Sequence, residues 1–439
     1  MAVGLPPPEL HLCPESAVAA LSHTTWQGPP RGVGAGLYNL GNTCFLNATL
    51  QCLAYCPPLA QLLDDSDDND DDGVDRSRGE PDGGASARAA LWGEGGGGQT
   101  FNVVMLLREL FGRLHGNGNS NSSSGGKKPA EKAVSPKALV ASLRALGRQF
   151  RVGRQEDAHE FLCHLLDGLH KHCLRSQGLR PHDPSLLASR VGDTSLVHRL
   201  FGGHLRSRLM CSTCRETSDK FEPFLDLSLH VKASGAPAAA ATGGGGGHKA
   251  KANGNGSHGH SNSGKADTIE AALERYTRGE VLEGDNQWEC PRCRTRRNAT
   301  KSLAIFRAPK VLCLQLKRFS FGRASAGRKI FAPVAFPEQL NLPIAELDPQ
   351  NDDNGSGNSA AAAASTTTTT AKNDAAAKAA AAKCRENSVS QERLKKNGGS
   401  GAGPTSIVGY TLTGVLVHRG ESVHSGHYYA FAKVTLFFS

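Results

Sequence analysis

The sequence predicts an α+β fold, because helical patterns occur early in the chain and strand patterns occur late. Two early segments place apolar residues at helical spacing. Two later segments alternate apolar and polar residues and are rich in β-branched and aromatic side chains. The blocks between these segments are rich in Gly, Ser, Asn and Ala. We interpret these blocks as loop insertions in one fold rather than as linkers, because no ordered block between them carries a complete set of motifs.

The first helix is predicted over residues 44–55. Leu46, Leu50 and Leu53 recur at i, i+4 and i+7, which places them on one face of a helix. A Pro-Pro pair at 57–58 ends the pattern, because proline cannot continue the helical hydrogen bonding.

The second helix is predicted over residues 154–174. Glu156 and Asp157 fall in its first turn, where the positive end of the helix dipole favours acidic side chains. The apolar stripe of this helix consists of Ala158, Phe161, Leu162, Leu165, Leu166, Leu169 and Cys173.

Strands are predicted over 311–321 (VLCLQLKRFSF) and 410–418 (YTLTGVLVH), where apolar and polar residues alternate. Four further stretches are too poor in apolar residues to offset the entropy of ordering them. They are residues 64–98, 116–128, 232–266 and 349–406. About two thirds of the 439 residues remain, which is enough for a large core.

The composition argues against a membrane protein and against a secreted one. No apolar run approaches the ~20 residues that a bilayer span needs. The start of the chain, MAVGLPPP, has neither a basic region nor an apolar region of the kind found in signal peptides. We therefore expect a cytoplasmic and/or nuclear location. In such a reducing compartment the 12 cysteines would serve metal binding, catalysis or core packing rather than disulfides.

A candidate nucleophile lies in residues 36–53 (GLYNLGNTCFLNATLQCL). Gly41 and Asn42 predict a turn, and Cys44 follows in the first turn of the helix, where the positive end of the dipole favours the thiolate. Asn39 lies on the preceding loop, from which its amide could donate to a developing oxyanion. Taken alone, a cysteine at a helix start is more often a small buried residue.

A thiolate nucleophile needs a base, and the best candidate is His427. It follows Ser-Gly at 425–426 and opens an aromatic, strand-like run. His418 and His424 are competing candidates. Any one of these histidines alone is more often a surface or packing residue, and it is the pairing with Cys44 that favours a catalytic role.

Two CxxC pairs predict a metal site. The pairs are Cys211 with Cys214 and Cys290 with Cys293. Each pair has the spacing that directs two thiolates at one metal, and four thiolates at tetrahedral geometry suit Zn²⁺. We expect a closed structural site that joins two hairpins distant in sequence. Redox use of a single CxxC pair is the alternative, and two pairs favour zinc.

A nucleic-acid function is an alternative interpretation of the second CxxC pair, because Arg292, Arg294, Arg296 and Arg297 flank it. No aromatic side chains alternate with these arginines to stack on bases, so we regard nucleic acid as an unlikely partner. The net charge of +9 is mild for a chain of this size.

In this order, the motifs resemble those of the ubiquitin-specific protease family, which are cysteine deubiquitinases. Residues 36–53 resemble the family's Cys box, and 153–166 (GRQEDAHEFLCHLL) are similar to its Gln-x-Asp-x-x-Glu helix. Residues 201–229 and 288–319 resemble its zinc-finger strands and Leu-x-Leu-Lys-Arg-Phe strand, and 410–434 resemble its His box.

The resemblance implies a papain-like fold with thumb, palm and fingers. It places a catalytic domain over 34–439, with the thumb over about 34–195 and the fingers and palm over about 196–439. A disordered segment is expected over 1–33.

The resemblance also implies hydrolysis of the isopeptide bond after the C-terminal Gly of ubiquitin, so that ubiquitin and ubiquitinated proteins would be the partners. Cys44 would be the nucleophile, His427 the general base and Asn39 an oxyanion-hole donor. Asp157 and Glu160, at i and i+3 on one helix face, would contact the basic ubiquitin tail. Without the resemblance, dipole compensation explains these two acidic residues as well.

The sequence departs from the family pattern after the His box. The family continues into a strand ending in Asp or Asn that orients the imidazole, and no Asp or Asn follows His427 here. We therefore expect a chain truncated after the His box, with weakened activity, since losing the orienting carboxylate costs about 10⁴ in kcat in a comparable triad. A catalytically dead ubiquitin-binding or decoy protein is the alternative.

Overall fold

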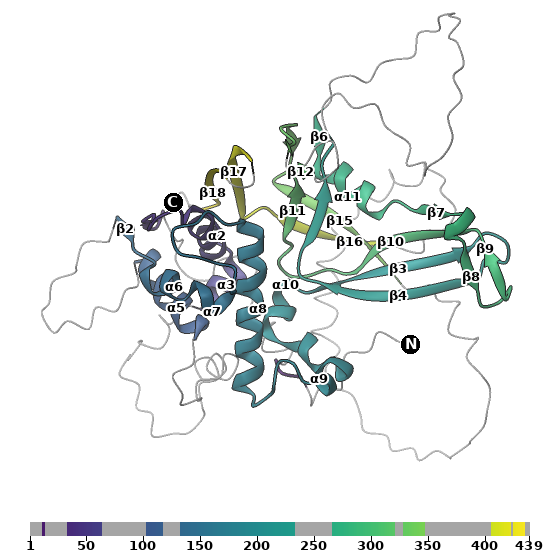
Figure 1. The fold of residues 1–439 in the computed structure, drawn as a ribbon, viewed down its shortest axis with the longest axis horizontal. Coiled ribbons are helices and arrows are strands. Elements are labelled where there is room, and N and C mark those ends of the chain that lie inside the picture. Colours follow the sequence, from purple (N-terminus) through teal and green to yellow (C-terminus); the bar gives the residue numbers. More distant parts are fainter. Residues whose placement is uncertain are drawn as a thin grey trace, which may run out of the picture. The chain divides into compact units, whose positions relative to one another are not determined.

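The computed structural model describes the ordered blocks of the chain, and the statements below concern these residues (Figure 1). They are residues 11–13, 33–63, 102–116, 132–232, 266–320, 328–346, 405–422 and 425–434. The four predicted insertions lie outside the described residues, apart from a few residues at their ends.

The chain divides into two compact units. The first contains Met1–Leu342 and Val408–Ser439, and the second contains Pro343–Ile407. Of the second unit the structure describes only 343–346 and 405–407, which are the ends of two strands. All the candidate site residues belong to the first unit.

The first part of the chain is helical, as predicted. Its helices are α2 (Cys44–Ala54), α3 (Pro57–Leu62), α5 (Val103–Leu114), α6 (Lys137–Ala141), α7 (Leu143–Leu146), α8 (Ala158–Ser176), α9 (Pro184–Ser189), the 3₁₀ turn η3 (Val191–Thr194) and α10 (Leu196–Phe201). A short parallel pair, β1 (Gly36–Leu37) with β2 (Ala133–Val134), precedes α2 and α6. Helices α2, α5 and α10 all pack against α8.

The core between these helices contains a cluster of three aromatic rings. The ring of Phe45 on α2 lies 5.6 Å from Phe161 on α8 and 6.3 Å from Phe150. All three rings are at most 1% exposed. Because these large side chains lock the start of α2 against α8, the residue before Phe45 is held in a fixed place relative to both helices.

The predicted helix boundaries hold to within a few residues. Helix α2 ends one residue before the predicted end, whereas α8 begins at Ala158 rather than at 154. Asp157 caps α8, because its side chain accepts hydrogen bonds from the backbone N–H groups of His159 and Glu160. Gly153, with φ of +85°, lies in the turn before it.

The second part of the chain is mostly strands. A four-stranded sheet has the order β4 (Thr217–Phe224), β3 (Gly203–Cys211), β10 (Ala299–Arg307) and β7 (Glu280–Leu282). The other strand pairs are β5 (Leu227–His230) with β11 (Leu314–Lys317), β6 (Asp267–Thr268) with β14 (Val334–Ala335), β8 (Trp288–Cys290) with β9 (Thr295–Arg297), β12 (Phe319–Ser320) with β13 (Arg328–Lys329), β15 (Gln339–Ala345) with β16 (Thr405–Thr411), and β17 (Gly414–Ser422) with β18 (Ser425–Ala432). One helix, α11 (Ile269–Thr277), and a 3₁₀ turn, η4 (Gly284–Asn286), interrupt them. The α+β prediction is confirmed.

Both predicted strands are divided in the structure. The segment 311–321 contains β11 and then β12, and the segment 410–418 contains the end of β16 and the start of β17. The break at 412–413 has a clear cause, because the Leu412 N–H donates to the carbonyl of Glu338 and the Thr413 carbonyl accepts from Lys433. The chain therefore changes hydrogen-bonding partners between the two strands.

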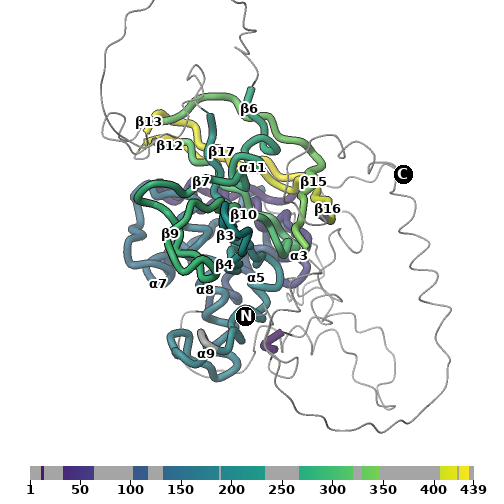
Figure 2. The backbone as a smooth tube through the Cα atoms, turned by 90° about the vertical axis from the view of Figure 1, so that its right-hand side faces the viewer, coloured from purple at the N-terminus to yellow at the C-terminus, as the bar shows by residue number. Residues whose placement is uncertain are grey.

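The last hairpin, β17–β18, is central to the site. Both strands pack against α2. Strand β13 lies beside β17 (Figure 2). Side chains of β18 alternate between half-buried and exposed, and Tyr428 and Ala432 pack against the helical core. The antiparallel register pairs His418 with Tyr428 and Arg419 with His427.

Residues 11–13 differ from the expectation of disorder over 1–33. Cys13 is 1% exposed, and its N–H donates to the carbonyl of Thr194 at 3.2 Å. The Leu12 N–H donates to Oγ1 of the same threonine at 2.9 Å. Two backbone hydrogen bonds and a buried side chain therefore offset the entropy of ordering these three residues, and the rest of 1–32 lies outside the described residues.

In the part of the chain that the structure describes, none of the helices combines the length and the apolar character that crossing a bilayer requires.

Candidate active site

Cys44 is the first residue of α2, as predicted. Thr43 occupies the N-cap position, and the first turn of the helix contains no acidic residue. The thiol is buried, at 5% exposure. The thiol therefore lies at the amino end of α2, next to the backbone N–H groups of the first helical turn.

Asn39 organises the turn before Cys44. Its Oδ1 accepts from the N–H of Gly41 at 3.2 Å, from the N–H of Thr43 at 3.0 Å and from the hydroxyl of Thr43 at 3.2 Å. Gly41 has φ of +95° and Asn42 has φ of +56°, so the turn is tight and left-handed. These donors occupy Oδ1 of Asn39. The Nδ2 group is therefore the part of this side chain that can donate a hydrogen bond to a substrate.

A second loop, residues 153–157, joins the Cys44 turn to the β17–β18 hairpin. The Asn42 side-chain nitrogen donates to the carbonyl of Gly153 at 2.7 Å. Two residues later, the amide of Gln155 makes two hydrogen bonds with the backbone of Gly426. The turn before α2, the loop before α8 and the start of β18 are therefore linked directly.

His427 lies on β18 directly after Gly426 and is exposed. The neighbouring Tyr428 is half-buried and packs against the core. Burial raises the pKa of Tyr428 to about 12, and the nearby negative charges of Asp157 and Cys44 act in the same direction. Tyr428 therefore stays a neutral phenol close to both Cys44 and the start of α8, and it shows that β18 reaches the Cys44 end of α2.

Of the two competing histidine candidates, the structure describes His418. His418 faces Tyr428, with ring centroids 4.6 Å apart, and its Nδ1 accepts from the ammonium of Lys329 at 3.0 Å. Burial first, and then the charge of Lys329, lower the pKa of His418. This imidazole is therefore packed and already hydrogen-bonded, whereas His427 is exposed; His424 lies outside the described residues.

Asp157 and Glu160 differ in part from the prediction. Oδ1 of Asp157 accepts from the N–H of His159 at 2.8 Å and from the N–H of Glu160 at 2.9 Å. Asp157 is therefore the N-cap of α8 rather than a residue on its face, because only the cap position lets a carboxylate reach these two donors. Glu160 is exposed in the first turn and accepts from the amide of Gln149 at 3.1 Å.

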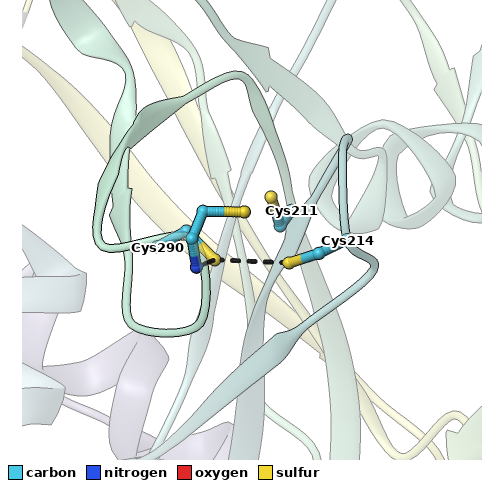
Figure 3. A group of neighbouring side chains, drawn as sticks. Cys211, Cys214 and Cys290 are labelled. Carbon is cyan, nitrogen blue, oxygen red and sulfur yellow. Dashed lines mark hydrogen bonds between the residues drawn. The ribbon is translucent and has the colours of Figure 1, made fainter.

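The four CxxC cysteines come together, as predicted. Cys211 ends β3 and Cys290 ends β8, and Cys214 and Cys293 lie in the turns that follow. Their sulfurs all lie within 4.8 Å of one another. Figure 3 shows the sulfurs of Cys211, Cys214 and Cys290 directed toward a common space.

The two turns share one backbone geometry. The residue after each second cysteine is left-handed, with φ of +62° at Arg215 and +53° at Arg294. Each of these residues donates its N–H to the carbonyl of the first cysteine of its pair, at 3.1 Å for Cys211 and 2.8 Å for Cys290. Two matched turns that present thiols to one space are typical of a tetrahedral metal site.

The distances and charges fit a metal. The Cys214 and Cys290 sulfurs are 3.5 Å apart, too far for the disulfide length of about 2.05 Å and close to the ~3.8 Å expected around tetrahedral Zn²⁺. The backbone N–H of Cys214 is the main cause that lowers the pKa of Cys211 to about 6, whereas the neighbouring sulfurs, Cys214 first, raise the pKa of Cys293 to about 12. Neighbouring sulfurs disfavour one another's ionisation here, so a bound cation would be needed for all four to be thiolates together. The four cysteines could bind a metal.

Comparison with known proteins gives the family. Residues 35–436 match the family model for ubiquitin carboxyl-terminal hydrolases (UCH). The chain belongs to the ubiquitin carboxyl-terminal hydrolase family. The match covers nearly the whole chain and contains the Cys44 turn, the α8 loop and the last hairpin, so the predicted family is confirmed.

Individual family members are similar at moderate identity. Ubiquitin carboxyl-terminal hydrolase 23 of Arabidopsis thaliana is 31% identical over 409 residues, which cover 92% of this chain and 32% of that protein. Ubiquitin carboxyl-terminal hydrolase 42 of Homo sapiens is 31% identical over 339 residues, which cover 77% of this chain and 19% of that protein. The chain thus spans a third or less of the length of these two relatives.

A solved structure supports the fold. A chain in the structure of the SAGA Ubp8/Sgf11/Sus1/Sgf73 DUB module bound to ubiquitin aldehyde matches this chain with a TM-score of 0.55 and 20% identity. The match covers 93% of this chain and 64% of that chain. The predicted papain-like α+β fold is therefore confirmed.

Three residues of the candidate site were not predicted from the sequence. Gln155 lies in the quoted GRQEDAHEF motif, but it had no assigned role. Asn42 was interpreted only as a turn residue, and Lys329 had no signal because it lies in an isolated short strand. The contacts of all three span long sequence separations, which periodicity cannot show.

Proposed function

We propose that the chain is a thiol-dependent deubiquitinase that hydrolyses the isopeptide bond after the C-terminal Gly of ubiquitin. One observation carries the proposal: β18, which contains His427, packs against α2, which begins with Cys44. Membership of the ubiquitin carboxyl-terminal hydrolase family supports the reaction. The similar DUB module, which is bound to ubiquitin aldehyde, supports ubiquitin and ubiquitinated proteins as the partners.

Cys44, His427 and Asn39 have separate roles in this mechanism. Cys44 attacks the carbonyl carbon of the terminal Gly as a thiolate, and its sulfur forms the new bond while the electron pair moves to the carbonyl oxygen. The Nδ2 group of Asn39 donates a hydrogen bond to that oxygen, because its Oδ1 is already held by Gly41 and Thr43. A preorganised donor needs no rearrangement as the negative charge develops.

His427 transfers the protons. His427 first takes the thiol proton of Cys44 and becomes an imidazolium. When the tetrahedral intermediate collapses, the imidazolium of His427 gives this proton to the leaving lysine amine, and a thioester remains on Cys44. The neutral imidazole then takes a proton from water, and the resulting hydroxide attacks the thioester and releases ubiquitin with a free carboxylate. The packing of His418 against Lys329 supports the assignment of these roles to His427.

Asp157 and Glu160 would bind the basic tail of ubiquitin. One oxygen of Asp157 caps α8, which leaves the second oxygen and the negative charge for a ligand. Glu160 is exposed one turn further along the helix. The two carboxylates lie beside the loop that joins the proposed nucleophile and base, so a tail bound there would enter the site.

We also propose that the ion in the four-cysteine cluster is a structural Zn²⁺. Four sulfur ligands would fill the tetrahedral coordination of Zn²⁺ and leave no open position for a substrate, so its role would be to hold the β3–β4 and β8–β9 hairpins together. Thiols that must stay reduced to bind zinc support a cytoplasmic and/or nuclear location.

The test of the proposed function is labelling with a ubiquitin whose C-terminus carries an electrophile. We expect labelling of the wild-type chain and none of Cys44→Ala. Cys52→Ala serves as the matched control, because Cys52 is a half-buried thiol on the same helix whose pKa burial raises to about 11. Labelling that persists in Cys44→Ala contradicts the assignment of the nucleophile.

Turnover of a ubiquitin–fluorophore amide by the same preparation separates an enzyme from a ubiquitin-binding protein. We expect turnover by the wild-type chain and a loss of at least 10²-fold in kcat for His427→Gln, since general base catalysis contributes about 10²–10⁴-fold. Ubiquitin binding without turnover would instead support a catalytically dead ubiquitin-binding or decoy protein.

A further inference from the structure

Three side chains that the proposed deubiquitinase chemistry does not use bring together a nitrogen, a sulfur and an oxygen. His159 and Cys163 lie on α8, and Asp226 lies between β4 and β5. Nε2 of His159 is 2.9 Å from Oδ2 of Asp226 and 3.6 Å from Sγ of Cys163. All three atoms lie within 4.8 Å of one another.

The elements that carry these residues hold the cluster in place. His159 and Cys163 are four residues apart, so they share one face of α8. Asp226 immediately precedes β5, which pairs in parallel with β11, and the hydroxyl of Ser228 donates to its Oδ2 at 3.4 Å. Two ligand atoms therefore come from a capped helix and the third from the end of a paired strand.

The geometry suits a small divalent ion. Zn²⁺ binds histidine nitrogen at about 2.0–2.1 Å, thiolate sulfur at about 2.3 Å and carboxylate oxygen at about 2.0–2.2 Å, which places tetrahedral ligands about 3.4–3.8 Å apart. The nitrogen–sulfur distance of 3.6 Å falls in this range. The 2.9 Å nitrogen–oxygen distance is that of a hydrogen-bonded ion pair, and it would open by about half an ångström around a metal.

The cluster is partly open to solvent, unlike a core ion pair. The side chain of His159 is 27% exposed and that of Asp226 is 23% exposed. An ion can therefore enter, and a water molecule can take the fourth position. The ligand set also differs from that of the four-cysteine cluster, because a nitrogen, a carboxylate oxygen and a water would replace three of the four thiolates.

We propose that His159, Cys163 and Asp226 form a second metal site, which binds a divalent ion of the Zn²⁺ class with water as its fourth ligand. Binding replaces the proton on Nε2 and the proton on the thiol, and both go to solvent. The ion would join α8 to the β5–β11 pair. Because the ion pair competes with it and only three protein ligands hold it, the second ion binds more weakly than the one in the four-cysteine cluster.

The experiment is equilibrium dialysis of the full chain against micromolar Co²⁺ as the probe, with metal content measured by mass spectrometry. We expect two ions per wild-type chain, the Zn²⁺ of the four-cysteine cluster and one Co²⁺, because Co²⁺ binds more weakly than Zn²⁺ and does not displace it from four thiolates. Cys163→Ser should hold the Zn²⁺ alone. His159→Gln and Asp226→Asn should also hold it alone. The near-isosteric Asp226→Asn keeps the test valid should the cysteine variant not fold.

His164→Gln and Asp167→Asn are the matched controls, because both residues lie on α8 outside the cluster, and both variants should keep two ions. The near-ultraviolet absorption of a single cobalt–thiolate bond should accompany the second ion and disappear in Cys163→Ser. One ion per wild-type chain, or two ions in all three ligand variants, overturns the second site. Neither result bears on the deubiquitinase proposal, because the assay contains no ubiquitin.

Discussion

The side-chain amide of Gln155 pairs with the backbone of Gly426, 271 residues further along the chain. Nε2 donates to the Gly426 carbonyl at 2.9 Å, and Oε1 accepts from the Gly426 N–H at 3.1 Å. The side-chain amide of Gln155 therefore pairs with the backbone of Gly426, the residue before His427, in the way that a neighbouring strand would. Because Asn42 ties the same loop to the turn before Cys44, one short loop positions both the proposed nucleophile and the proposed base.

Gln155→Ala should lower kcat of the proposed deubiquitinase by about 10–100-fold while KM changes less. The two lost hydrogen bonds are worth about 0.5–1.5 kcal/mol each, and each 1.36 kcal/mol in the barrier is tenfold in rate. The effect falls on kcat because the bonds hold the strand of His427 rather than the substrate. Steady-state hydrolysis of a ubiquitin–fluorophore amide measures both constants.

Gln287→Ala is the matched control for this variant. Gln287 also makes a side-chain amide hydrogen bond, to the amide oxygen of Asn298 at 2.8 Å, but it lies next to the β8–β9 hairpin. We expect its kcat to stay within about twofold of wild type, as surface substitutions usually change free energies by no more than about 0.5 kcal/mol. Equal kcat values for Gln155→Ala and Gln287→Ala would show that Gln155 does not position the base.

Gly426→Ala should destabilise the folded chain by about 1–3 kcal/mol, the usual cost of overpacking. A Cβ at this position would lie 2.2 Å from Nε2 of His418 and 2.7 Å from the carbonyl oxygen of Arg419. His418 has no room to withdraw, because Lys329 holds its Nδ1 and Tyr428 packs against its ring. Urea unfolding followed by circular dichroism gives the free energy of unfolding.

The control for the glycine variant is Gly36→Ala in β1. A Cβ there meets its nearest atom, the carbonyl oxygen of Lys132, at 3.7 Å, which is an ordinary contact. We expect a change in unfolding free energy within about 0.5 kcal/mol of wild type. A Gly426→Ala chain as stable as Gly36→Ala would mean that the hairpin can shift, and that His418 is not locked against Gly426.

The features that the sequence predicted correctly depend on residues close together in the chain. Helix α2 was predicted with one end residue in error, because the spacing of its leucines is local information. The four-cysteine cluster was predicted because a CxxC spacing fixes each half of the site. The contacts of Gln155 with Gly426 and of His159 with Asp226 were not predicted, since they join residues 271 and 67 positions apart and depend on tertiary packing.

The errors in the prediction have physical causes. Asp157 was placed on a helix face, but it accepts two backbone N–H groups as the cap of α8, and a sequence pattern cannot separate the cap from the first turn. The segment 410–418 was predicted as one strand, although the chain changes partners at Leu412. Alternating apolar residues continue through that change, so the period alone does not reveal it.

Acid should destabilise the chain through His170. Burial first, and then the charge of His198, lower its pKa to about 4 from the usual 6.5, while Asp167 and Asp193 act in the opposite direction. Between these two pKa values the unfolded state binds more protons than the folded state, so stability falls as the pH drops from about 6.5 to 4. The Nδ1 contact with Ser195 at 2.9 Å holds the ring in place.

Urea midpoints measured at pH 7.5 and pH 4.5 test this dependence. We expect the wild-type midpoint to fall on acidification and that of His170→Asn to fall less, because the buried group that must take up a proton is gone. His182→Asn, at an exposed position, serves as the control. Equal acid sensitivity of the wild-type and His170→Asn chains would assign the effect to other groups.

Removing the proposed Zn²⁺ from the four-cysteine cluster should loosen the β3–β4 and β8–β9 hairpins without abolishing chemistry at Cys44. Cys290→Ser deletes one of four ligands at the end of β8, so we expect this cluster to lose its Zn²⁺ and the melting temperature to fall, because binding free energy of a structural metal is folding free energy. The folded fraction should still react with the ubiquitin electrophile, since Cys44 begins α2 and is not one of the four cysteines of the cluster. Cys52→Ser is the matched control and should keep the metal. Metal content is measured by mass spectrometry, and labelling is measured on the same samples. A metal-free wild-type chain would contradict the zinc site. Loss of labelling in a folded Cys290→Ser chain would contradict the independence of the two sites.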